Sequence, residues 1–199
     1  YQATGSTKFL NIARRYADCV CREVGEGEGK ACVVPGHQIA EMALARLYIA
    51  TGERRYLDEA KFLLDKRGHT KIRSAYSQSH KPILKQKEAV GHAVRAGYMY
   101  AGIADVAAIT GDSAYINAID GIFSNRVGKK YYITGGVGAT SDGEAFGANY
   151  ELPNLTAYNE TCAAISMVYL FHRMFLLHGD SKYIDCMERT LYNGVISGM

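Results

Sequence analysis

The fold is decided by residues 93–115, which read AVRAGYMYAGIADVAAITGDSAY. Residues 93–109 are apolar nearly all round, so a helix formed there must be buried. Gly111 can take the left-handed conformation that ends a helix, and Asp112 favours the start of the next one. We therefore expect a buried helix, a tight turn and a second helix, which together form a helical hairpin.

The same arrangement occurs twice more along the chain. Residues 51–56 (TGERRY) and 178–183 (HGDSKY) repeat the Gly, acid, two residues, Tyr pattern of residues 110–115. An apolar segment of helical length precedes each of these two turns, at 39–50 and 162–177, and an amphipathic segment follows each. Buried helices that alternate with amphipathic ones predict an inner and an outer layer, as in an α/α toroid.

One domain accounts for the whole chain. The segment 6–24 adds one more helix and brings the total to about seven, whereas a closed ring of six hairpins needs about twelve. We therefore predict an all-α fold in which residues 1–199 form part of one (α/α)6 toroid, with no internal domain boundary. The glycine-rich segment 128–154 interrupts the helices as a loop or short β-hairpin insertion, the first place to look for chemistry, and alternation at 130–134 predicts a brief strand within it.

Composition excludes several classes of protein. A net charge of +3, from 23 basic and 20 acidic residues, gives no support for nucleic-acid binding. The apolar run 93–109 contains Arg95 and Asp105 and is shorter than the ~20 residues of a bilayer span, so no membrane association is expected. Five cysteines, an odd number, indicate reduced thiols or a metal site. No targeting segment is visible at Tyr1, so we expect a cytoplasmic fragment, while nothing indicates its oligomeric state.

Three polar residues stand at equivalent places in the repeat. His92 and Glu160 each precede their turn glycine by 19 residues, and His37 precedes its glycine by 15. All three therefore lie at the start of a buried helix, and such starts meet on one rim of a toroid. Helix N-termini at that rim favour negative charge. The alternative is that these side chains merely cap their helices.

Carboxylates suggest two kinds of chemistry near that rim. Glu144 and Glu160 could be the acid pair of a glycosidase, and burial beside Phe146 would favour the protonated form of Glu144 that a general acid needs. The alternative is a solvated loop residue. Glu160 and Cys162 could bind zinc if the segment is not yet regular helix, whereas a core cysteine behind a capping glutamate is the alternative.

Several ordered motifs resemble glycoside hydrolase family 127, the β-L-arabinofuranosidase family, over essentially the whole chain. The motifs are Pro35-Gly-His37, Glu41-Met-Ala-Leu44, Tyr76-Ser-Gln-Ser-His80, Gly91-His-Ala-Val-Arg-Ala96, Tyr132-Ile-Thr-Gly-Gly136, Gly143-Glu-Ala-Phe146 and Ala157-Tyr-Asn-Glu-Thr-Cys162. The resemblance implies a catalytic (α/α)6 toroid and retaining hydrolysis of terminal β-L-arabinofuranosides in carbohydrates such as plant cell-wall glycans. It also implies a zinc ion held by one Glu and three Cys, one of which is the nucleophile.

The resemblance also implies individual roles. Glu144 matches the general acid/base, Glu160 and Cys162 match zinc ligands, and His37 and His92 match residues of the substrate pocket. The other two cysteines of the family belong to a later motif that residues 163–199 do not contain, because Cys186 lies in an amphipathic outer helix. We therefore expect an incomplete zinc site and no activity from the isolated chain.

Two other function classes compete with this one. A non-catalytic helical scaffold, or a degenerate relative, would keep the toroid without its chemistry. Another toroidal sugar enzyme, such as an epimerase or an unsaturated glucuronyl hydrolase, would share the fold alone.

Overall fold

The computed structural model describes residues 1–198, and this part of the chain contains seven α-helices and no β-strand. The helices are α1 (Lys8–Glu23), α2 (Ala40–Thr51), α3 (Arg54–Lys66), α4 (Ala93–Thr110), α5 (Ser113–Lys129), α6 (Thr161–His178) and α7 (Ser181–Thr190). Short 3₁₀ turns occupy Ile83–Lys85 and Asp142–Glu144, and α7 continues into a π-helical turn, Leu191–Val195, and a 3₁₀ turn, Ile196–Gly198. The all-α prediction is confirmed.

The strand predicted at 130–134 is wrong. Gly135 N–H donates to the Tyr132 carbonyl at 2.9 Å, and Tyr132 N–H donates to the Gly136 carbonyl at 3.0 Å. The backbone therefore closes a turn on itself. The alternation in the sequence is real, since Tyr132 is buried and Ile133 is 90% exposed. It reflects a single turn against the core rather than a strand.

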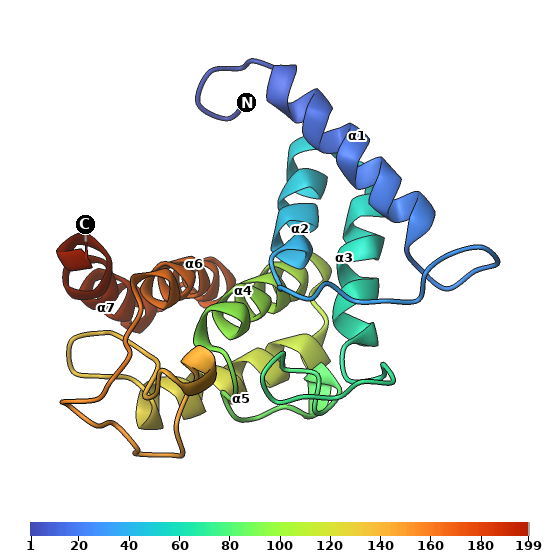
Figure 1. Cartoon of the computed structure of the whole chain (residues 1–199). Helices are drawn as coiled ribbons and strands as arrows, with labels where there is room; N and C mark the ends of the chain where they lie inside the picture. Colours follow the sequence, from blue (N-terminus) through green and yellow to red (C-terminus); the bar gives the residue numbers. More distant parts are fainter. Residues whose placement is uncertain (199) are drawn as a thin grey trace.

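The three repeated turns are equivalent, as the sequence predicts. Gly52, Gly111 and Gly179 have φ angles of 73°, 67° and 71°, and each ends an inner helix in the left-handed conformation. The hairpins α2/α3, α4/α5 and α6/α7 follow one another along an arc that starts at α1 (Figure 1). The arc is part of an α/α toroid.

The tyrosine of each repeat ties its outer helix to the preceding outer helix. All three tyrosines are buried. The contacts are Tyr56 Oη donating to Asp18 at 2.8 Å, Tyr115 Oη donating to Asp65, and the Tyr183 ring against the Phe123 ring with 4.8 Å between centroids. The repeated tyrosine therefore sets the order of the outer helices α1, α3, α5 and α7.

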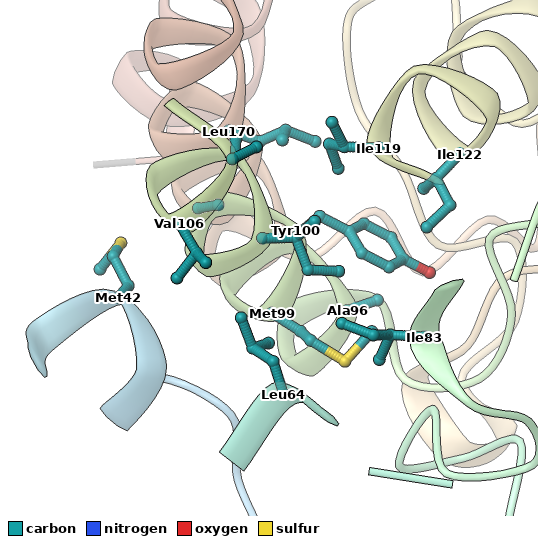
Figure 2. Close-up of a cluster of buried hydrophobic side chains, with 14 of the residues drawn as sticks. Met42, Leu64, Ile83, Ala96, Met99, Tyr100, Val106, Ile119, Ile122 and Leu170 are labelled. Atoms are coloured by element: carbon teal, nitrogen blue, oxygen red, sulfur yellow. The ribbon is translucent and has the colours of Figure 1, made fainter. Parts of the chain in front are cut away.

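Helix α4 lies at the centre of the core. Figure 2 shows its Met99, Tyr100 and Val106 side chains among residues from the helices around it. Helices α4 and α6 approach closely at Gly97, where an added Cβ would lie 1.9 Å from the Ser166 hydroxyl oxygen. This close packing fixes the inner layer on which the functional residues stand.

Helix α6 is, within residues 1–198, the only one long and apolar enough to pass a test for membrane spans, by length and composition only. It packs against α4 and α7. Its Arg173 pairs with Asp105 of α4 at 3.1 Å, and both side chains are buried. These are the contacts of a core helix.

Candidate functional site

The starts of α2, α4 and α6 lie near one another, as the repeat predicts. The rings of His37 and His92 are 6.2 Å apart between centroids. Asn159, just before α6, donates its N–H to the Gly138 carbonyl at 3.0 Å, and a Cβ added at Gly138 would lie 3.9 Å from Ala93 Cβ at the start of α4. The charges of Glu144 and, less strongly, Glu160 raise the pKa of Tyr158. The glycine turns lie at the far ends of α4 and α6, which at 1.5 Å per residue are about 27 Å long. The predicted rim therefore exists.

His92 and Glu144 form a close pair, with 2.7 Å between Nε2 and Oε2. His92 also caps α4, because its Nδ1 accepts the backbone N–H of Arg95 at 3.3 Å. A nitrogen that accepts carries no proton, so in the neutral ring the proton lies on Nε2 and is donated to the carboxylate. The helix cap thus fixes the tautomer that meets Glu144. His92 therefore caps α4, as the alternative interpretation states, and also takes part in the site.

Glu144 lies on a strained turn at the rim. Its φ of 49° is in the left-handed region, which non-glycine residues seldom adopt. Tyr158 Oη donates to Oε1 at 3.3 Å. The Glu144 side chain is 42% exposed, so the burial that would favour its protonated form is not complete. The buried member of this turn is Phe146, while the carboxylate points back along the surface to His92.

The two segments that carry His92 and Glu144 are joined through their backbones. Phe146 N–H donates to the Gly91 carbonyl at 3.0 Å, and Ala145 forms an antiparallel bridge with His92. Gly91 has a φ of 71°, and an added Cβ would lie 2.0 Å from the Ala75 carbonyl oxygen. The glycine before His92 is therefore required both by conformation and by space.

Gln78 is a buried residue that organises the same region. Its side-chain Nε2, with two N–H groups, lies within hydrogen-bond distance of three carbonyl oxygens, those of Tyr76, Val90 and His92, at 3.1, 2.9 and 3.2 Å. Its φ of 53° is another left-handed value close to the site. Sequence reasoning did not assign Gln78 or Tyr158 to the site, although both lie inside motifs of the family resemblance.

Aromatic rings line the rim around the two histidines. Tyr76 lies edge-on to His92 with 5.4 Å between centroids, and the Arg95 guanidinium lies 4.7 Å above the Tyr76 ring. Tyr98 lies 6.1 Å from His37. Burial raises the pKa of Tyr98, so its hydroxyl stays protonated and polar at neutral pH. Rings with polar edges of this kind suit a sugar ligand.

Glu160 and Cys162 stand together at the start of α6. Glu160 occupies the N-cap position, but its side chain makes no capping bond. Cys162 is exposed, and the neighbouring Glu160 carboxylate is the main influence that raises the pKa of its thiol. The alternative of a core cysteine behind a capping glutamate is therefore wrong. Oxygen and sulfur donors suit zinc, but residues 1–198 hold no group of three or more metal-binding side chains.

The sequence profile described as "Beta-L-arabinofuranosidase, GH127 catalytic domain" matches residues 1–199. The chain belongs to glycoside hydrolase family 127. A non-reducing end β-L-arabinofuranosidase of Bifidobacterium longum subsp. longum is 36% identical over 220 residues, which span all of this chain and 33% of the relative.

Solved structures agree with the family 127 assignment. A GH127 β-arabinofuranosidase is 68% identical with a TM-score of 0.96, and a GH127 β-L-arabinofuranosidase from Geobacillus stearothermophilus T6 is 42% identical with the same score. The chain is covered completely in both and spans 31% and 34% of those proteins, so it corresponds to about a third of their length.

A cellobiose 2-epimerase from Spirochaeta thermophila resembles the chain at 11% identity and a TM-score of 0.58, with 94% of this chain and 55% of that one covered. At this identity the likeness concerns the fold alone. The family match favours the glycosidase interpretation over the epimerase one.

Proposed function

We propose that the chain is part of a retaining β-L-arabinofuranosidase that removes terminal β-L-arabinofuranosyl groups from carbohydrates. The observation that carries this proposal is the His92–Glu144 pair, 2.7 Å apart, on the rim that also bears Glu160 and Cys162. Retaining hydrolysis needs an acid/base on one side of the scissile bond and a nucleophile on the other. Glu144 supplies the first of these groups.

Glu144 would first protonate the departing sugar oxygen and then take a proton from the attacking water. Its surroundings suit both steps. Tyr158 Oη, a hydroxyl, can donate to the carboxylate or accept from the carboxylic acid, so it accommodates either state of Oε1. His92 Nε2–H always donates and keeps Oε2 in place. Exposure of Glu144 to solvent gives the water access to it.

His37 would bind a sugar hydroxyl in this scheme. Its side chain lies at the exposed start of the α2 segment, and its Nδ1 is 3.0 Å from the Gln38 carbonyl oxygen. A carbonyl only accepts, so Nδ1 carries the proton and Nε2 is left as an acceptor. A hydroxyl of the arabinofuranosyl ring is a suitable donor for that nitrogen.

Glu160 and Cys162 would supply two donors to a zinc ion. Their carboxylate and thiol are of the type zinc prefers, and neither is consumed by a helix cap. When bound, zinc lowers the pKa of a coordinated thiol and makes a thiolate available near neutral pH. Further donors would come from outside residues 1–198. The chain's own contribution is to hold this pair on the first turn of α6, at the same rim as Glu144.

The test is a chimera in which these 199 residues replace the matching segment of the 68% identical β-arabinofuranosidase. We expect the chimera to hydrolyse an aryl β-L-arabinofuranoside. Glu144→Gln should lower kcat/KM by about 10²–10⁴-fold, whereas Glu151→Gln, a carboxylate of the same segment that caps the Ala148 N–H, should not. The 199-residue chain alone should be inactive. A folded chimera without activity, or one indifferent to Glu144→Gln, would refute the proposal.

A further inference from the structure

Arg126 of α5 is a buried cation without conventional partners. It is fully buried, and its three guanidinium nitrogens make no hydrogen bond. Burial lowers its pKa to about 10, which still leaves it charged at neutral pH. What surrounds it is aromatic, because the guanidinium carbon lies 5.0 Å from the centroid of the Phe146 ring and 5.6 Å from that of Tyr100. Attraction to these rings is its principal polar contact.

Phe146 connects this cation to the candidate catalytic pair. It follows Glu144 by two residues, and its backbone N–H donates to the carbonyl of Gly91, the residue before His92. Displacement of the Phe146 ring would therefore move the turn that holds Glu144 relative to the segment that holds His92. Such a movement would change the 2.7 Å distance between the His92 imidazole and the Glu144 carboxylate.

Helix α5 and the residue that follows it, Lys130, also hold the other segment. Asn125 Oδ1 accepts the Ala89 N–H at 3.0 Å, and Lys130 Nζ donates to the Ala89 carbonyl at 2.7 Å. Residues before and after Arg126 thus fix the approach to His92, while Arg126 itself contacts the segment of Glu144. One outer helix positions both sides of the pair.

We infer that Arg126 is a positioning residue, which holds the Phe146 ring so that Glu144 meets His92. It acts through that ring and touches neither carboxylate nor imidazole. The positional part of this inference stands on the geometry of the chain, and its consequence for catalysis rests on the proposed function.

If Arg126 served only to stabilise the fold, its replacement by Met would lower the urea midpoint of unfolding. We expect a different result. A buried charge without hydrogen bonds costs desolvation that an apolar side chain of similar length does not. Arg126→Met should therefore leave the urea midpoint unchanged or raise it. Arg173→Met is the matched control, since Arg173 is a buried arginine that pairs with Asp105 away from the site. It should lower the midpoint, because it leaves Asp105 buried and unpaired.

The decisive measurement is NMR of the 199-residue chain labelled with ¹⁵N-histidine. We expect His92 to be the Nε2–H tautomer, with its Nε2 proton hydrogen-bonded to Glu144. The signal of this proton is assigned as the one that shifts in Glu144→Gln. Arg126→Met and Phe146→Leu should each shift this signal toward that of Glu144→Gln, and the double variant should add little. Phe146→Tyr, which keeps the ring, and Arg173→Met should leave it unchanged.

Activity of the chimera gives the second readout. Arg126→Met should lower kcat by about ten- to hundredfold with little change in KM, as a small misplacement of a reacting group does. A His92 signal untouched by Arg126→Met, or an Arg126→Met chain that fails to fold, would overturn the inference. An inactive parent chimera would instead count against the proposed function, and the NMR result would still decide the positional role.

Discussion

The glycine before His92 gives the most quantitative test of how the rim is built. In Gly91→Ala, the new Cβ would lie 2.0 Å from the carbonyl oxygen and 2.6 Å from the carbonyl carbon of Ala75, and 2.7 Å from Tyr76 Cα. All three atoms belong to the backbone, so no side chain can rotate out of the way. The segments that carry Tyr76 and His92 would have to separate.

Gly111→Ala provides the reference for conformation alone. Its φ of 67° is close to the 71° of Gly91, but no atom lies within 4 Å of its added Cβ. A left-handed conformation costs an L-residue about 1–2 kcal/mol, and both variants share this cost. Overpacking adds about 1–3 kcal/mol to Gly91→Ala only. We therefore expect it to lose about 2–5 kcal/mol of unfolding free energy, against about 1–2 kcal/mol for Gly111→Ala.

Urea unfolding followed by circular dichroism measures both losses. At about 2–4 °C per kcal/mol for a chain of this size, the two melting temperatures should also differ by several degrees. The ¹⁵N signal of His92 should shift in Gly91→Ala and not in Gly111→Ala. Equal losses from the two substitutions would refute the reasoning, because they would mean that the contact with Ala75 does not limit this position.

Two other predictions concern stability and metal binding. Tyr115→Phe removes the hydrogen bond to Asp65 and should lower the unfolding free energy by about 1–2 kcal/mol in urea, since the carboxylate is charged but 43% exposed; no loss would mean that the repeat tyrosine does not tie the outer helices together. The isolated chain should bind zinc with low affinity. This affinity should rise about tenfold per pH unit from pH 6 to 8, because zinc displaces the proton of the Cys162 thiol, whose pKa is raised. Competition with a fluorescent chelator measures this affinity, Cys162→Ser should abolish the pH dependence while Cys32→Ser keeps it, and tight binding independent of pH would contradict the assignment.

The helices could be predicted because their signals are local. The apolar segment expected at 39–50 is α2, Ala40–Thr51, and its end is set by a glycine that any reader of the sequence can find. The strand expected at 130–134 failed because alternation over five residues does not distinguish a strand from one turn against a core. What decides between them is the pairing of Tyr132 with Gly136, which depends on the folded chain.

The site was predictable only in part, because some of its residues are defined by contacts of the folded chain rather than by a local sequence pattern. His37, His92 and Glu160 could be predicted because each lies at or just before the start of an inner helix of the repeat. His92 and Glu160 are the N-caps of α4 and α6, whereas His37 lies two residues before Ile39, the N-cap of α2. Gln78 and Arg126 could not be predicted, because their roles arise from contacts between segments far apart in the sequence. A buried glutamine or arginine carries no periodic signal, and its partners become known only when the loops are placed.

The rim can bear polar residues because helices begin there. A helix start leaves backbone N–H groups without partners, so an inner helix buried along its length still tolerates a polar side chain at its first position. His92 uses this tolerance by capping α4, and the cap directs its other nitrogen to Glu144. Glu160 has the same position in α6 and makes no capping bond, so its carboxylate is left free of the cap, and it raises the pKa of the nearby Cys162 thiol. His92 thus combines capping with a place in the site, whereas Glu160 is available to the site because it does not cap. For this reason, position in the repeat locates the site but does not assign the roles.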